Sequence, residues 1–218
     1  MGIDLIVFDL DGTLIDSGRD LADATNAMLV GFGAAPLSTG SVAAMVGEGA
    51  AVLVRRALTA AELDPDMPGA LERFLACYDE RLLVHTRPYD GMVETLAALK
   101  TACALAVLTN KPTRATTRIL AGLRLSDYFD RVIGGDTSYG RKPNPEGLQH
   151  LMKAAGATTE STVLVGDSRI DLETARRTGV RICLARYGFG FAFKEGDLGP
   201  DDIAIDRAGD LIRALDLG

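Results

Sequence analysis

The sequence predicts an α/β fold: a parallel sheet core with an all-helical cap domain inserted into it. Two observations support this prediction. Short apolar runs alternate with helical patterns over most of the chain, and one long segment near the N-terminus carries helical periodicity alone. Strands that alternate with helices of this length form βαβ units, and these units build parallel, Rossmann-like sheets.

The core strands are predicted from apolar runs that are too short for helices and typical of strands buried on both faces. These runs cover residues 3–8, 104–108, 131–133, 162–165 and 180–184. The helical patterns between them cover residues 92–100, 113–120, 145–155 and 171–179. The stretch 202–215 is expected to add an edge strand and a last helix.

The segment between Ser17 and His85 holds no convincing strand pattern. Its helical stretches are separated by glycines and prolines, which break helices. They cover residues 21–32, 41–46, 51–58 and 70–83. We therefore predict an α/β core from residues 1–17 and 86–218 and a helical cap from residues 18–85, hinged at Ser17-Gly18 and near Thr86.

Charge and composition exclude several classes of function. The net charge of −7 argues against a nucleic-acid partner, because nucleic acids are bound through clustered Lys and Arg. The apolar stretches fall short of the ~20 residues that span a bilayer. Asp4 and Asp9 interrupt any signal-peptide core, so we expect a cytoplasmic protein without membrane contact. Cys77, Cys103 and Cys183 lack zinc-site spacing and are expected to be reduced thiols.

Polar residues follow the predicted strands at the points where the strands end. Ligands of open α/β sheets bind outside the carboxyl ends of the strands, so we expect these residues to share one edge. They are Asp9, Asp11 and Gly12 after the first run, Thr109 and Asn110 after the second, Lys142 beyond the third, and Asp167 and Asp171 after the fourth.

Carboxylates gathered at one edge would raise one another's pKa unless a cation lay between them. An oxygen-rich, nitrogen-poor set of ligands favours Mg²⁺ over zinc. Thr109 and Asn110 offer hydrogen-bond donors, and Lys142 offers a point charge for a phosphoryl oxygen. Gly12 lets the backbone approach an anion closely. These residues together predict a Mg²⁺ site that receives a phosphorylated ligand.

The segments Phe8-Asp9-Leu10-Asp11-Gly12-Thr13-Leu14, Leu108-Thr109-Asn110, Lys142-Pro143 and Gly166-Asp167-Ser168-Arg169-Ile170-Asp171 resemble, in order, the four motifs of the haloacid dehalogenase (HAD) superfamily. The resemblance covers the whole core, and the helical segment is similar to that superfamily's first cap type. Residues 105–112, Gly134-Gly135-Asp136 and Val46-Gly47-Glu48-Gly49-Ala50 look like bacterial phosphoglycolate phosphatases.

The resemblance implies a role for each core residue. Asp9 would attack phosphorus to give an aspartyl-phosphate, and Asp11 would act as general acid and then as general base. Two residues apart in an extended chain, Asp9 and Asp11 have side chains that point to the same side, which suits a nucleophile and an acid that act on one substrate. Mg²⁺ would be held by Asp9, the Asp11 backbone carbonyl and Asp167, with Asp171 in support. The transferring phosphoryl group would be bound by Thr109, Asn110 and Lys142.

The cap residues carry weaker signals. The segment Gly47, Glu48 and Gly49 is a candidate substrate-specificity loop, although a plain turn between helices also explains it. Arg55 could bind a substrate carboxylate, or it could be ordinary surface charge on a helix. Two departures from the family pattern, Ile170 and the turn 186–190, are expected to leave the metal and phosphoryl ligands untouched.

Several functions compete with phosphoglycolate hydrolysis. A phosphonatase needs a cap lysine, and residues 18–86 contain none; a dehalogenase needs no acid at Asp11. A pyrophosphatase, a sugar-phosphate phosphatase and a β-phosphoglucomutase stay open. A phospho-accepting signalling domain is disfavoured by the inserted cap. We expect a Mg²⁺-dependent phosphatase of a small, carboxylated phosphomonoester, with 2-phosphoglycolate preferred and the oligomeric state undetermined.

Overall fold

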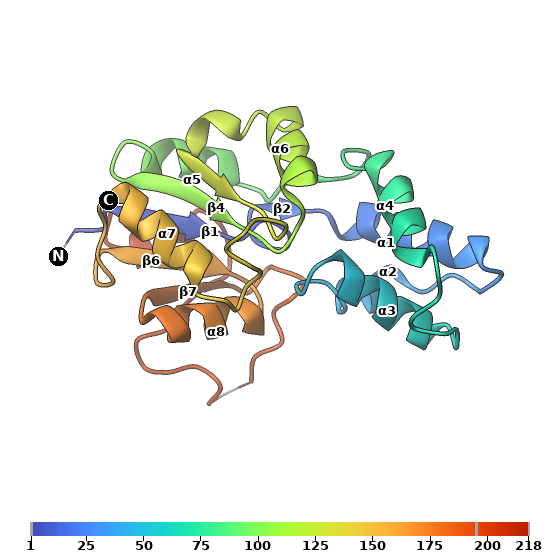
Figure 1. Ribbon diagram of the computed structural model, residues 1–218. Coiled ribbons are helices and arrows are strands. Elements are labelled where there is room, and N and C mark those ends of the chain that lie inside the picture. Colours follow the sequence, from blue (N-terminus) through green and yellow to red (C-terminus); the bar gives the residue numbers. More distant parts are fainter. Residues whose placement is uncertain (1, 195, 218) are drawn as a thin grey trace.

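The computed structural model describes residues 2–194 and 196–217, and its core is a parallel sheet with the strand order β5-β4-β1-β6-β7-β8 (Figure 1). The predicted α/β class is confirmed, including the edge strand near the C-terminus. The strands are β1 (Leu5–Phe8), β4 (Ala104–Leu108), β5 (Arg131–Ile133), β6 (Thr162–Gly166), β7 (Arg181–Ala185) and β8 (Ile203–Ile205).

The central strand β1 pairs with β4 on one side and with β6 on the other, so that Leu5 lies opposite both Ala104 and Thr162. Every residue of β1 is buried, as its unbroken apolar run predicts for a strand covered on both faces. This arrangement brings the residues that follow β1, β4 and β6 to the same edge of the sheet.

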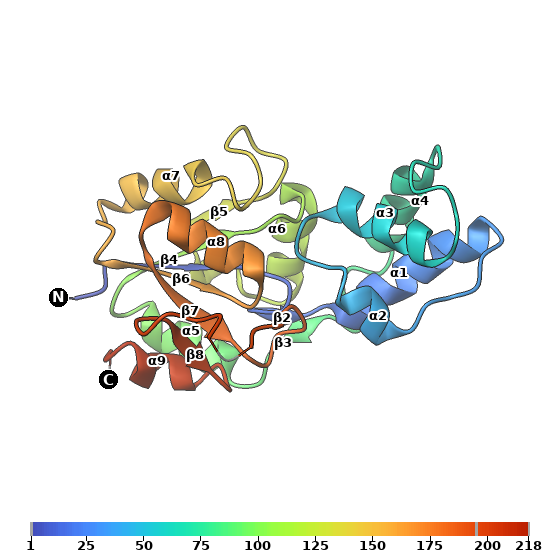
Figure 2. The same ribbon diagram turned by 90° about the horizontal axis from the view of Figure 1, so that it is seen from below.

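Helices cover both faces of the sheet (Figure 2). Leu5 and Val7 of β1 share an apolar cluster with α7 and α8, whereas Ile6 and Phe8 share one with α5, α6 and α9. The alternation follows from the two-residue period of a strand. The helices are α5 (Met92–Leu99), α6 (Thr113–Gly122), α7 (Glu146–Ala155), α8 (Arg169–Thr178) and α9 (Asp210–Ala214), with a short 3₁₀ helix at Ser126–Tyr128.

Residues 18–85, which we call the helical insert, lie beyond the carboxyl ends of the strands (Figures 1 and 2). Their helices are α1 (Gly18–Gly31), α2 (Thr39–Ala43), α3 (Ala50–Ala60) and α4 (Ala70–Asp79). Met28, Leu58 and Phe74 from three of them are completely or almost completely buried in one apolar cluster. Helix α4 ends at Asp79 rather than near residue 83, because the chain turns where the Arg81 N–H donates to the Tyr78 carbonyl.

A short antiparallel ribbon marks the place where the chain enters and leaves the helical insert. Strand β2 (Ile15–Asp16) pairs with β3 (Arg87–Pro88), next to the predicted hinges. Strands of this length are too short to show alternation, so the sequence did not predict them. Among the described residues, no helix is both long and apolar enough to cross a membrane.

Candidate active site

The first acidic motif places Asp9 and Asp11 at the carboxyl end of β1. The Asp9 N–H donates to the Val165 carbonyl of β6, and Asp9 Oδ1 accepts the Leu10 N–H at 2.7 Å. The Asp9 side chain is buried, with the residue 6% exposed. The sheet therefore fixes the backbone of Asp9, and burial removes most of the water from its carboxylate.

Lys142 joins Asp9 to the fourth motif. Lys142 Nζ lies 2.9 Å from Asp9 Oδ1 and 2.6 Å from Asp171 Oδ1. The second oxygen of Asp171 accepts the Ser168 N–H at 3.0 Å and the Ser168 hydroxyl at 2.6 Å. Although burial works to lower it, the pKa of Lys142 is raised by the carboxylates of Asp171 and Asp9, so the amine stays charged.

Asp167 directly follows β6 and lies close to Asp9 and Asp171. Its Oδ2 accepts the Gly190 N–H at 2.7 Å, and its Oδ1 accepts the Thr13 hydroxyl at 3.3 Å. A Cβ at Gly12 or at Gly188 would collide with this carboxylate, and Gly12 also has a φ of +84°. Only glycine fits at Gly12, because the left-handed backbone and the contact both exclude a side chain.

The turn 186–190 thus touches the acidic cluster, which corrects the expectation that this departure from the family pattern would contact no ligand residue. Its glycines, Gly188 and Gly190, are placed against Asp167 by the backbone of the turn. The sequence pattern hid this contact, because the hydrogen bond comes from a main-chain N–H. The other departure, Ile170, lies in the first turn of α8.

The acidic cluster is electrostatically suited to a cation. One oxygen from each of Asp9, Asp167 and Asp171 lies within 4.8 Å of the others. Burial raises the pKa of Asp9 to about 6, with Lys142 opposing this rise, and burial raises the pKa of Asp167 well above its usual value. Because these three described residues all offer carboxylate oxygens, a hard divalent cation fits the residues present.

The second motif brings Thr109 and Asn110 to the same edge, after β4. The Thr109 N–H donates to the Ile133 carbonyl of β5, and Thr109 Oγ1 accepts the Lys111 N–H at 3.2 Å. Asn110 Nδ2 donates to the Gly47 carbonyl at 2.9 Å and to the Lys142 carbonyl at 3.0 Å. Asn110 therefore ties the helical insert to the core, and its side-chain amide N–H groups are not free for a phosphoryl oxygen.

The predicted residues of the helical insert separate into two groups. Gly47 accepts from Asn110, and Gly49 lines the cavity described below. Glu48 forms an ion pair with Arg56 instead of pointing into the cavity. Arg55 forms an ion pair with Asp66, and both side chains are more than half exposed. The structure therefore does not bring Glu48 and Arg55 to the cavity, and it favours the alternative that Arg55 is surface charge.

A cavity of about 430 Å³ lies between the helical insert and the sheet edge. Its floor includes Asp9, Asp11 and Thr109 from the core, and its walls include Leu21, Leu53, Phe74, Tyr78 and Leu82 from the insert. The cavity therefore places the carboxylates of Asp9 and Asp11 under a largely apolar roof, where electrostatic interactions are stronger than in water.

Lys111 and Tyr78 are site residues that the sequence argument did not single out. Lys111 Nζ lies 2.9 Å from Asp11 Oδ1 and 2.7 Å from Asp11 Oδ2, and it lies 4.7 Å from the centre of the Tyr78 ring. The Ser17 hydroxyl donates to Asp11 Oδ1 at 2.5 Å. Lys111 directly follows the second motif, so its position in the sequence was an available signal. Tyr78 had none, because aromatic residues on an amphipathic helix normally pack in a core.

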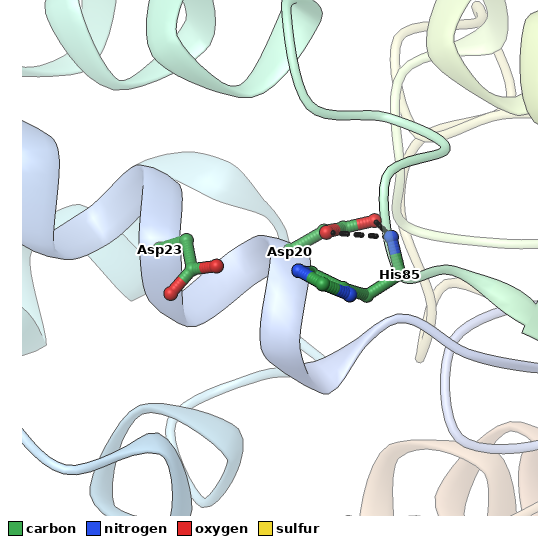
Figure 3. A group of neighbouring side chains, drawn as sticks. All are labelled: Asp20, Asp23 and His85. Carbon is green, nitrogen blue, oxygen red and sulfur yellow. Dashed lines mark hydrogen bonds between the residues drawn. The ribbon is translucent and has the colours of Figure 1, made fainter.

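A second group of possible metal ligands, Asp20, Asp23 and His85, lies at the base of the helical insert (Figure 3). Asp20 is 1% exposed, and its oxygens accept the N–H groups of His85 and Thr86 and the Thr86 hydroxyl at 2.8–3.0 Å. Backbone donors therefore already occupy Asp20, which joins the start of α1 to the returning chain.

Comparison with known proteins identifies a family for this chain. The family model described as haloacid dehalogenase-like hydrolase matches residues 6–185. Phosphoglycolate phosphatase 1 of Pseudomonas aeruginosa is 39% identical, with 97% of this chain and 79% of the relative covered. A relative from Cupriavidus necator, named as a plasmid phosphoglycolate phosphatase, is 36% identical, with 96% and 90% covered.

A solved structure resembles the whole chain. The crystal structure of a protein from Haemophilus somnus, described as a predicted phosphoglycolate phosphatase, superposes with a TM-score of 0.89 at 32% identity and covers 97% of both chains. The matched family model spans the sheet from Ile6 of β1 to Ala185 of β7, without β8, and it includes all four motifs that gather at the sheet edge. The chain belongs to the haloacid dehalogenase-like hydrolase family.

Proposed function

We propose that this protein is a Mg²⁺-dependent phosphatase that hydrolyses a small phosphomonoester through an aspartyl-phosphate on Asp9. The observation that carries the proposal is the contact of Asp9 with Lys142 at 2.9 Å, inside an acidic cluster that also contains Asp167. A buried carboxylate beside a fixed cation has the parts that in-line phosphoryl transfer requires, namely a nucleophile and a charge for the phosphoryl oxygens.

The reaction has two displacements in this proposal. An Asp9 oxygen forms a bond to phosphorus while the bond from phosphorus to the ester oxygen breaks, and Asp11 gives its proton to the leaving alkoxide. Water then attacks phosphorus, Asp11 takes the proton from that water, and the bond between phosphorus and Asp9 breaks. The position of Asp11 supports this double role, because Asp11 lines the cavity two residues beyond Asp9.

Asp9, the Asp11 carbonyl and Asp167 would hold the Mg²⁺. When bound, Mg²⁺ supplies positive charge that neutralises the phosphoryl oxygens and offsets repulsion between the carboxylates. Asp171 would act mainly through Lys142, since its oxygens already accept from Lys142 and Ser168. Lys142 and the Thr109 hydroxyl would bind the phosphoryl group, while Asn110 would hold the helical insert against the core.

Residues 18–85 would act as a cap that closes over the substrate and excludes water. The short ribbon of β2 and β3 supports the separation of the chain into a core and a cap, because it ties together the two points at which the helical insert joins the core. The hydrogen bond from Asn110 to Gly47 is a contact that closure would form, because Asn110 belongs to the core and Gly47 belongs to the insert.

We propose 2-phosphoglycolate as the preferred substrate. The names of the relatives from Pseudomonas aeruginosa and Cupriavidus necator support this choice. A cavity of about 430 Å³ favours a second candidate, a phosphorylated sugar, because this volume lies in the range of sites that hold larger ligands than glycolate.

The test compares kcat/KM for 2-phosphoglycolate, glucose phosphates, nucleotides and pyrophosphate at saturating Mg²⁺. We expect 2-phosphoglycolate to lead the series; a larger value for a sugar phosphate would favour the second candidate. Asp9→Asn should lose phosphate release from every substrate, because a neutral amide is a poor nucleophile. Asp4→Asn, a change of the same kind at an exposed position, should keep wild-type rates. Near-normal turnover by Asp9→Asn would end the proposal.

A further inference from the structure

The cavity contains a cation and a hydroxyl that the proposed phosphoryl chemistry does not use. Lys111 is 7% exposed and Tyr78 is 5% exposed, and both line the cavity beside Asp11. The Tyr78 hydroxyl has no hydrogen-bond partner among the described residues. A buried polar group without a partner costs free energy, which binding of a suitable ligand atom would recover.

We propose that Lys111 and Tyr78 form a subsite for a carboxylate on the leaving group, an inference that rests on the proposed phosphatase function. The substrate would carry this carboxylate on the carbon that bears the ester oxygen. Lys111 would pass from Asp11 to the substrate carboxylate, and the Tyr78 hydroxyl would donate to the same group.

The position of Lys111 next to Asp11 supports the assignment of a carboxylate subsite. In the proposed reaction the ester oxygen faces Asp11, and Lys111 Nζ lies 2.7 Å from Asp11 Oδ2. A carboxylate attached next to the ester oxygen therefore falls within reach of Lys111. This movement of Lys111 toward the substrate also releases Asp11 from its contact with Lys111. The carboxyl group of Asp11 is then free to turn toward the leaving oxygen.

Other cations near the cavity are placed less well. Lys142 is already shared by Asp9 and Asp171 at the phosphoryl end. Arg114 is the other basic residue among the described residues that line the cavity, and it is exposed. A buried ammonium discriminates an anion from a neutral group more strongly than an exposed one, because water does not screen it.

Tyr78 also makes the subsite depend on the helical insert. It lies on α4, whereas Lys111 and Asp11 belong to the core, so the subsite is complete only when the insert lies over the sheet edge. Recognition of the leaving-group carboxylate would therefore favour the closed arrangement of the protein.

The experiment compares 2-phosphoglycolate with ethyl phosphate, in which a methyl group replaces the carboxylate. The measured quantity is the ratio of their kcat/KM values. We expect Lys111→Met to lower this ratio about 10- to 100-fold, largely because the carboxylated substrate binds more weakly and its KM rises, and Tyr78→Phe to lower it about 3- to 10-fold. Lys111→Arg should recover part of the ratio. The control Lys100→Met, which removes an ion pair with Asp130 outside the cavity, should leave it unchanged.

Turnover of p-nitrophenyl phosphate, which needs little help from a general acid, reports whether each variant is folded. Equal losses for 2-phosphoglycolate and ethyl phosphate in Lys111→Met would overturn the inference, because Lys111 would then serve Asp11 alone. A lower ratio of the two kcat/KM values in Arg114→Met but not in Lys111→Met would overturn the inference as well. If the wild type hydrolyses phosphomonoesters without preferring 2-phosphoglycolate over ethyl phosphate, the subsite fails while the phosphatase stands. Absence of all phosphatase activity would remove both.

Discussion

Lys142 Nζ lies 2.6 Å from Asp171 Oδ1, and the two side chains are 1% and 0% exposed. The same ammonium lies 2.9 Å from Asp9, so two buried carboxylates share one buried cation. Removing one partner from such a group leaves an uncompensated charge in a medium that solvates it poorly. The proposed nucleophile and the fold therefore depend on the same residue.

The first prediction concerns Lys142→Met. We expect the free energy of unfolding to fall by about 3–5 kcal/mol because Asp9 and Asp171 lose their shared cation. We also expect kcat to fall by about 10²- to 10³-fold because the phosphoryl group loses a fixed positive charge. Urea unfolding and steady-state kinetics measure the two effects. Lys100→Met removes a partly exposed pair with Asp130 and should cost less than about 1 kcal/mol; a similar cost in both variants would contradict the prediction.

The second prediction concerns Asp11→Asn. An asparagine cannot give a proton to the leaving alkoxide, so hydrolysis of alkyl phosphates should slow by about 10²- to 10⁴-fold. Formation of the phosphoenzyme from p-nitrophenyl phosphate should be much less affected, because p-nitrophenolate leaves without protonation. Rapid quenching followed by phosphate analysis separates this first step from hydrolysis. Equal losses on alkyl and aryl substrates would refute the role of Asp11 as general acid.

The convergence of the core residues at one edge of the sheet was predictable from the sequence, because the carboxyl ends of parallel strands meet at that edge. Asp9, Thr109 and Asp167 each follow a buried apolar run, and parallel pairing of those runs is enough to gather them. Lys142 comes instead from the loop between β5 and α7. The sequence did not reveal the contact between Asp167 and the Gly190 N–H, since main-chain donors leave no residue-type signal.

The helical insert was less predictable than the core. Its helices followed from periodicity, but which of their side chains face the sheet depends on how the insert packs as a unit. Tyr78 thus reaches Lys111, while Arg55 turns to Asp66 outside the cavity. A charge on an amphipathic helix can serve a substrate or the solvent, and only tertiary packing decides between them.

The third prediction concerns metal and pH. Burial raises the pKa of Asp167 well above its usual value, and the nearby carboxylates of Asp171 and Asp9 raise it further. A carboxyl group whose pKa is raised by folding contributes stability at low pH that is lost as the pH rises through the folded pKa. For Asp9, whose pKa is raised from 3.8 to about 6, this loss of stability takes place between these two pH values. Metal-free protein should therefore lose stability from these groups as the solution approaches neutral pH, and Mg²⁺ should restore it.

Asp167→Asn tests this assignment. Without metal at pH 8, the variant should be about 1–2 kcal/mol more stable than the wild type, because it avoids the cost of folding a carboxyl group whose pKa is raised by burial. Added MgCl₂ should raise the Tm of the wild type and leave that of the variant almost unchanged. Melting curves in EDTA and in MgCl₂ between about pH 5 and pH 8 measure both effects. The same gain from Mg²⁺ in both proteins would place the metal elsewhere.

The last prediction concerns the group in Figure 3. Asp20→Ala should cost about 2–4 kcal/mol of unfolding free energy, because the N–H groups of His85 and Thr86 would lose a buried acceptor. Asp23→Ala is the matched control: Asp23 lies on the same helix, and its ion pair among the described residues is an exposed one with Arg19, at 3.9 Å. It should change the free energy of unfolding by less than about 0.5 kcal/mol. If this group instead bound a metal, both variants would lose stability, EDTA would destabilise the wild type to the same degree, and Asp167→Asn would retain that sensitivity to EDTA. A large loss confined to Asp20→Ala, independent of EDTA, identifies Asp20 as the residue that anchors the start of the helical insert to its end.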